Sequence, residues 1–226
     1  MTTPTTVTVP SRATLEKFFE RMDSVPHGRI ILGIDATASR QPSWDLASKL
    51  QAEMFETVAA IGGLDIQLVY YRGSGECQAS RWMTGGKALA RIMSTVTCRA
   101  GHTQIARTLR HAGKEHAKQK INALILISDA CEEIPADLYA AARELGFPVF
   151  MFREGDDERV GEIYAEIARI TGGAHCKFDS DAAQHLADLL TAVAAFAVGG
   201  VQALADQNSE AARLLLTQVK TSKADD

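Results

Sequence analysis

The sequence has little cysteine, and none of it is paired at short spacing. Cys77, Cys98, Cys131 and Cys176 form no CxxC pair, so neither a zinc site nor a disulfide framework is indicated. An apolar stretch of the kind found in secretory signals is also missing from the N-terminal MTTPTTVTVPSR. Free thiols and the missing signal predict a cytoplasmic protein.

Basic residues are not in excess either. The chain has 24 Lys and Arg against 28 Asp and Glu, which gives a net charge of −4. A surface that follows nucleic-acid phosphates needs clustered positive charge, so we expect no nucleic-acid partner. One basic cluster has helical spacing, and we interpret it as the solvated face of a helix. It consists of Arg107, Arg110, Lys114, Lys118 and Lys120.

An uninterrupted apolar run that could span a membrane and a glycine-rich phosphate loop are absent as well. Residues 186–205 are largely apolar, but they are rich in alanine and include Asp188 and a break at Gly199-Gly200. We therefore predict no membrane partner. The turn after the first apolar run reads DATAS, and no GxxxxGK[ST] motif occurs, which excludes the usual nucleotide-binding loops.

What is present is a regular alternation of two patterns. With 46% apolar and 23% charged residues in 226 positions, the chain has the composition of one folded soluble domain with appendages. Short apolar runs predict buried strands: 29–35, 64–71, 121–129, 148–152 and 174–178. Amphipathic patterns between or after them predict helices: 44–61, 86–98, 103–118, 136–145, 160–171, 181–198 and 201–219.

This alternation predicts an α/β fold. It favours a doubly wound, mostly parallel six-stranded sheet with helices on both faces. Residues 77–82 leave too little chain for a helical crossover, so they are expected to form a short antiparallel edge strand. We divide the chain into a flexible tail and short helix (1–24), the α/β domain (25–198) and a C-terminal helix and tail (199–226).

Oxygen-bearing side chains follow the predicted strands where an open α/β sheet binds its ligands. Asp35, Thr37 and Ser39 follow the first strand, Asp129 ends the strand 121–129, and Thr103 opens the helix before it. Two carboxylates and three hydroxyls suit a hard cation such as Mg²⁺ or Mn²⁺. Residues two apart in an extended turn point the same way, so we predict a metal site.

The segments that carry these residues resemble the motifs of von Willebrand factor A-like domains. IDATAS resembles their DxSxS motif, GHTQIARTLRHA their threonine motif and LILISDACEE their aspartate-bearing motif. EIYAEIARITGGAHCKF is similar to their closing helix, glycine pair and last strand, so the resemblance covers roughly residues 29–180. It implies a Rossmann-like fold and a metal-ion-dependent adhesion site made of Asp35, Thr37, Ser39, Thr103 and Asp129.

Several residues near this set allow other interpretations. A phosphohydrolase that uses Asp35 as nucleophile is disfavoured, because position 37 is threonine where such enzymes need a second aspartate as acid and base. Cys131 is interpreted as a packing residue, since no group is evident that would orient His102 beside it. Glu132 and Glu133 are either acids favoured at the start of the following helix or groups that tune the cation site.

The sequence thus predicts a non-enzymatic binding module. The cation is expected to take an acidic side chain of a partner protein, as the resemblance implies. An apolar stripe in the last predicted helix either docks on the domain or serves dimerisation or partner capture. The stripe consists of Val201, Leu204, Ala212, Leu215 and Val219. A metal-dependent phosphohydrolase, and a scaffold with a vestigial metal site that binds through these helices, remain the alternatives.

Overall fold

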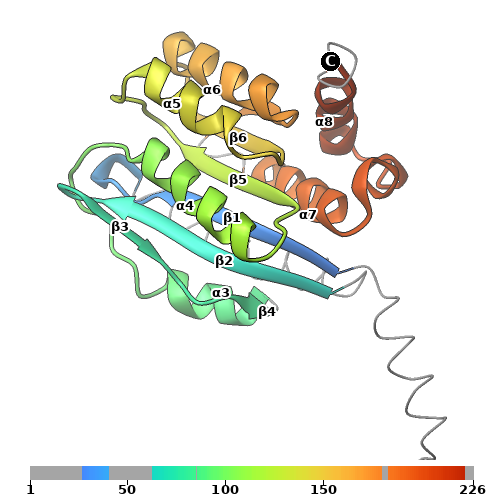
Figure 1. Cartoon of the computed structure of the whole chain (residues 1–226), viewed down its shortest axis with the longest axis horizontal. Coiled ribbons are helices and arrows are strands. Elements are labelled where there is room, and N and C mark those ends of the chain that lie inside the picture. The colour runs from blue at the N-terminus through green and yellow to red at the C-terminus, as the bar shows by residue number, and fades with distance from the viewer. Residues whose placement is uncertain (1–26, 41–62, 85, 180–182, 222–226) are drawn as a thin grey trace, which may run out of the picture.

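The computed structural model describes residues 27–40, 63–84, 86–179 and 183–221. The predicted tail and short helix (1–24) and the predicted helix 44–61 lie outside these ranges. The described part forms one sheet with helices packed on its two faces, in the order of an α/β domain (Figure 1).

The sheet runs in the order β3-β2-β1-β5-β6-β7. β1, β2, β5, β6 and β7 are parallel neighbours, and β3 pairs antiparallel with β2 at one edge. The strands are β1 (His27–Asp35), β2 (Gly63–Arg72), β3 (Glu76–Ala79), β4 (Met83–Thr84), β5 (Ala123–Ser128), β6 (Val149–Glu154) and β7 (Ala174–Phe178). The predicted parallel sheet and antiparallel edge strand are confirmed.

The described residues form seven strands, one more than the predicted six. β4 pairs antiparallel with β2 through only two residues, so it is too short to leave an alternating pattern in the sequence.

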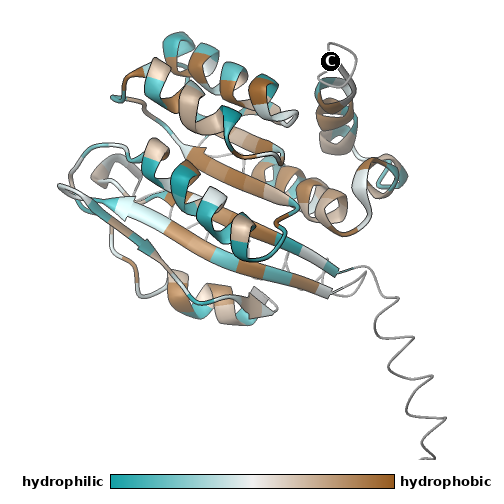
Figure 2. Ribbon diagram, in the orientation of Figure 1, coloured by the Kyte–Doolittle hydropathy of each residue, from teal (hydrophilic) through white to brown (hydrophobic). Residues whose placement is uncertain are grey.

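Helices cover both faces of the sheet. They are α3 (Gly86–Met93), α4 (Ile105–Lys118), α5 (Pro135–Arg143), α6 (Glu158–Thr171), α7 (Ala183–Asp206) and α8 (Glu210–Thr221), with a 3₁₀ turn η1 (Ala38–Arg40) after β1. One core cluster joins the strands to α4, α5 and α6, and the other joins them to α3, α7 and α8. Figure 2 shows the apolar strands between helices that carry polar residues on one side. Two separate cores are expected when both faces of a parallel sheet are covered.

The C-terminal helices differ from the prediction of a single break at residues 199–200. Gly200 adopts φ 67° and kinks α7, but helical structure resumes after it and continues to Asp206. The second break follows, where Asn208 takes a positive φ of 50°. Leu204, Ala212, Leu215 and Val219 are buried in the core cluster that α7 makes with the sheet.

The predicted apolar stripe is therefore docked on the domain. Val201 is half-buried against the same core cluster. A stripe that already covers the protein's own core is not exposed for dimerisation.

One helical segment of the described chain, Gln184–Asp206, is long and apolar enough to cross a membrane by length and composition. Half of its most apolar window is buried inside the protein, where it packs on β1, β2, β5 and α8. Its apolar side chains thus contribute to the core of the domain.

Candidate functional site

Asp35 lies at the carboxyl end of β1, the strand between β2 and β5. Its side chain is fully buried, and each carboxylate oxygen already accepts one hydrogen bond. Oδ1 accepts from the backbone N–H of Thr37 at 2.8 Å, and Oδ2 accepts from the hydroxyl of Ser128 at 2.7 Å. A carboxylate oxygen has a second lone pair, so both atoms can still accept from a water molecule or a cation.

Thr37 and Ser39 follow in the turn that leaves β1. Their hydroxyl oxygens are 3.2 Å apart and share a hydrogen bond, which confirms that these side chains point the same way. The turn is attached to the neighbouring strand by a bond from the N–H of Ala36 to the carbonyl of Tyr71. Thr37 is buried and Ser39 is exposed, so the pair leads from the sheet to the surface.

Asp129 follows β5 directly, next to the end of β1. Burial raises the pKa of Asp35, and the negative charge of Asp129 adds to this rise. The two carboxylates are thus close enough to repel each other. Oδ1 of Asp129 is inaccessible to solvent and has no hydrogen-bond partner among the described residues. An unpaired buried carboxylate oxygen is costly unless a cation or a donor meets it.

Thr103 is attached to the loop that follows Asp129. Its N–H donates to the carboxylate of Glu132 at 2.9 Å, and its hydroxyl accepts from the N–H of Glu132 at 3.2 Å. The next acid, Glu133, accepts from the backbone N–H groups of Ile105 and Ala106 at 2.5 and 2.9 Å. Both glutamates therefore bind the N-terminal end of α4.

This corrects the interpretation of the two glutamates as acids at the start of the helix that follows them. α5 begins after Ile134 with Pro135 and has no side-chain cap. α4 has no acid in its first turn and no cap from its own residue Gln104. Glu133 thus supplies from another element the carboxylate that a helix N-terminus favours.

Gly101, two residues before Thr103, lies against the turn that follows β2. A Cβ atom at this position would lie 2.2 Å from the carbonyl oxygen of Gly73, so only glycine lets the loop approach the turn after β2. The guanidinium of Arg72 also donates to the hydroxyl of Thr97 at 3.1 Å. These contacts hold the loop that carries Thr103.

Sequence reasoning did not identify Ser128 or Tyr164 as parts of the site. Ser128 is fully buried and orients Asp35 from the adjacent strand. The hydroxyl of Tyr164, on α6, donates to the carbonyl of Ala130 at 2.7 Å and so holds the loop after Asp129. The parallel pairing of the two predicted strands could have placed Ser128 beside Asp35, but nothing in the sequence linked Tyr164 to this loop.

Cys131 is a packing residue, as expected. It is 4% exposed, and its thiol lies 3.9 Å from the carbonyl of Glu133. Burial raises the pKa of this thiol, which disfavours the thiolate that a nucleophile requires. His102 is exposed at the edge of the site.

The donor set fits a hard cation. No group of three or more His, Cys, Asp or Glu side chains within the described ranges is arranged to hold a metal ion. The predicted set differs from such a group because it has two carboxylates and three hydroxyls. The unpaired oxygen of Asp129 is the observation that favours a cation here, since Mg²⁺ and Mn²⁺ take oxygen ligands.

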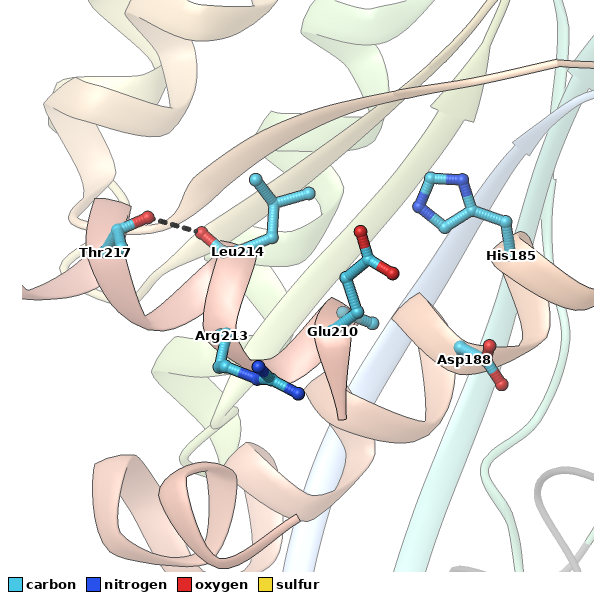
Figure 3. Close-up of a pocket in the computed structure, with 7 residues that line it drawn as sticks. His185, Asp188, Glu210, Arg213, Leu214 and Thr217 are labelled. Carbon is cyan, nitrogen blue, oxygen red and sulfur yellow. Dashed lines mark hydrogen bonds between the residues drawn. The ribbon is translucent and has the colours of Figure 1, made fainter. Parts of the chain in front are cut away.

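A second surface feature lies away from this site. A pocket of about 590 Å³ lies between α7 and α8, and none of the five predicted ligands lines it. Figure 3 shows His185 and Asp188 of α7 on one side and Glu210, Arg213 and Leu214 of α8 on the other.

The strand order and the helices on both faces define an open, Rossmann-like α/β domain that carries polar residues at the carboxyl edge of its sheet. No family model matches the sequence, and no curated protein matches it. Solved structures do match, and they show that the chain has the fold of von Willebrand factor A domains.

Three of these structures illustrate the similarity. A von Willebrand factor type A protein from Catenulispora acidiphila has a TM-score of 0.61 and 19% identity over 76% of this chain and 43% of its own. The VWA domain of SpRpn10 has a TM-score of 0.54 and 9% identity over 72% of this chain and 94% of its own. The vWF domain of the type V pili tip protein Mfa5 from Porphyromonas gingivalis has a TM-score of 0.54 and 12% identity over 74% and 95%. The chain thus spans less than half of the first of these.

Proposed function

We propose that this protein is a non-enzymatic binding module that holds Mg²⁺ or Mn²⁺ at the carboxyl edge of its sheet and uses it to bind an acidic side chain of a partner protein. The proposed ligands are Asp35, Thr37, Ser39, Thr103 and Asp129. Neutral hydroxyls leave a bound cation electropositive enough to accept a carboxylate from outside, and a cation of this kind keeps positions open for water or a partner. We also propose a cytoplasmic location.

The observation that carries the proposal is the unpaired buried oxygen of Asp129 beside a second buried carboxylate, Asp35. Two adjacent negative charges of which one lacks a hydrogen bond are destabilising for the protein alone. A divalent cation removes both costs, because it compensates the repulsion and contacts the unpaired oxygen.

The surroundings of Asp35 favour binding over hydrolysis. Both of its oxygens accept hydrogen bonds within a fully buried site, so the carboxylate is held as a ligand rather than exposed as a nucleophile. Thr37 also supplies no acid for a leaving group. The buried stripe of α8 likewise argues against a scaffold that captures partners through these apolar residues.

The similar structures support a partner that is a protein. They include the pilus adhesin SpaC from Lactobacillus rhamnosus GG, the human COPII-coat protein Sec24c and the pili tip protein Mfa5. Their names describe adhesion and assembly, and we extend only this general role to the present chain.

Isothermal titration calorimetry of the full chain with Mg²⁺ and with Mn²⁺ tests the metal site. The Asp35→Ala, Asp129→Ala double variant should lose cation binding. An Asp188→Ala, Asp206→Ala variant removes the same charge from exposed positions on α7 and should bind as the wild type does. Circular dichroism should show that all three proteins are folded.

Two outcomes would contradict the proposal. Equal cation binding by the wild type and the Asp35→Ala, Asp129→Ala variant would show that these residues do not form a metal site. Magnesium-dependent turnover of a phosphomonoester that Asp35→Asn abolishes would instead identify a hydrolase.

A further inference from the structure

A groove runs between the edge strand β3 and helix α4, on the face of the sheet that α4 covers. It has a volume of about 380 Å³. Its apolar floor is formed by Val69, Cys77 and Ala79, and its wall by one side of α4. Figure 1 shows β3 at the outer edge of the sheet.

The wall of this groove is positively charged. Arg107, Arg110 and Lys114 lie on successive turns of α4, and no carboxylate lines the groove. Arg107 donates to the carbonyl of Gly75 at 2.6 Å, so a cation of this row already binds the backbone of the turn between β2 and β3. Arg110 and Lys114 are exposed and have no hydrogen bond or ion pair with described residues. In a chain with a net charge of −4, this concentration of cations favours an anionic ligand.

The outer edge of β3 offers backbone groups for pairing. In an antiparallel ladder, residues alternate between those that bond to the partner strand and those that face away. The N–H of Ser80 donates to the carbonyl of Leu68 in the direction of β2, and Gln78 has the same parity. Cys77 and Ala79 therefore direct their N–H and C=O groups outward, where β3 pairs with no other described strand.

The geometry couples these two features. A strand that pairs with this outer edge places every second side chain on the face of Cys77 and Ala79, which is the face of α4. Those side chains meet Arg110 and Lys114. The groove thus fits an extended segment with acidic residues at alternate positions.

We propose that the β3–α4 groove binds an extended acidic segment of another protein, which adds to β3 as a further strand while its alternate carboxylates contact Arg110 and Lys114. This surface is separate from the proposed metal site and does not depend on it. A single-stranded nucleic acid fits less well, because no Phe, Tyr or Trp side chain lines the groove to stack on a base. The imidazole of His111, which does line it, is hydrogen-bonded to Gln67 at 2.8 Å.

Fluorescence anisotropy with a labelled peptide of about four Thr-Glu repeats, the length of an ordinary strand, tests the proposal on the full chain at low salt with EDTA. An Arg110→Glu, Lys114→Glu variant should weaken binding by about tenfold or more, because two attractive contacts become repulsive. A Lys120→Glu, Arg213→Glu variant makes the same charge change on exposed residues outside the groove and should leave binding unchanged.

Strand pairing itself is tested on the peptide, so that the fold of the protein is untouched. N-methylation of either the Glu or the Thr set removes alternate N–H groups. Methylation of one set should abolish binding, and methylation of the other should leave it unchanged. The reason is that only every second residue of an added strand bonds to β3.

Three results would overturn the proposal: no binding of the peptide, equal tolerance of both methylated peptides, or tighter binding of an oligothymidine of equal charge. The first two results would contradict the addition of a strand to β3, and the third would identify a nucleic-acid surface. EDTA keeps the test independent of the metal site.

Discussion

His175 shows how one half-buried side chain makes the stability of this protein depend on pH. Its imidazole packs edge-on against Tyr164, with ring centroids 6.3 Å apart. Burial, and to a smaller extent the charge of Arg153, lower the pKa of His175 from 6.5 to about 4. The folded protein therefore keeps this histidine neutral at a pH at which the unfolded chain protonates it.

This shift predicts a loss of stability on the acid side. As the pH falls from 6.5 towards 4, the unfolded state gains a proton that the folded state does not, so the free energy of unfolding decreases. The contribution is about 2 kcal/mol, after allowance for the partial exposure of the ring. His175→Phe should reduce the slope of stability against pH in urea denaturation.

The matched variant is His185→Phe, which changes an exposed histidine of α7 and should keep the wild-type slope. An unchanged slope in His175→Phe would show that this residue is not the buried neutral group.

The site residues also differ in how far sequence could predict them. Asp35, Thr37 and Ser39 are neighbours in the chain, so their common direction followed from local spacing. Ser128 and Glu133 act across 93 and 28 positions of sequence. Their roles depend on strand pairing and on the packing of loops, which no local pattern encodes.

At the scale of elements, α4 depends on a carboxylate from outside the helix. Glu133 accepts from Ile105 and Ala106, so Glu133→Ala leaves two N–H groups without this partner. We expect a loss of about 1–2 kcal/mol in the free energy of unfolding. Faster hydrogen exchange at these two amides should accompany it.

Glu162→Ala is the control, because Glu162 is exposed on α6 and truncation there should change stability by less than about 0.5 kcal/mol. Similar effects of both variants would contradict the role of Glu133 as a cap.

Element boundaries were predictable where a local stop signal is decisive. α6 ends at Thr171, which is the predicted end, and Gly172 directly after it adopts φ 70°. Gly200 is also left-handed, yet α7 resumes after it because Leu204 packs into the core. Tertiary packing thus outweighs the local signal, and the end of the helix moves to Asp206.

At the scale of the whole molecule, α8 belongs to the folded domain. Leu215 is fully buried, whereas the adjacent Leu214 is 41% exposed. Leu215→Ala should therefore cost about 2–4 kcal/mol through lost burial and a cavity, and Leu214→Ala less than about 1 kcal/mol. Chemical denaturation of both variants measures the difference.

Equal effects of the two leucines would show that α8 does not dock through the face that contains Leu215. Size-exclusion chromatography of Leu215→Ala at equal concentration would then report whether the helix instead joins two chains.

The overall architecture followed from sequence because both cores rest on repeated patterns. Ile30 and Ile34 face one core while Ile31 faces the other, so strands buried on both faces read as continuous apolar runs. The strand order was not encoded in this way. It depends on crossovers between distant segments, and no strand order was predicted from the sequence.

The two edges of the sheet end differently. At β7, Gln218 of α8 accepts from the N–H of His175 at 2.8 Å and donates to its carbonyl at 2.9 Å, so a side-chain amide occupies that edge. The edge of β3 has no such cover among the described residues. If two copies of the protein pair through their β3 edges, both open edges are used and the covered β7 edges remain outside. A third copy then has no open edge to join. The molecule therefore resists polymerising into fibrils while one edge remains open.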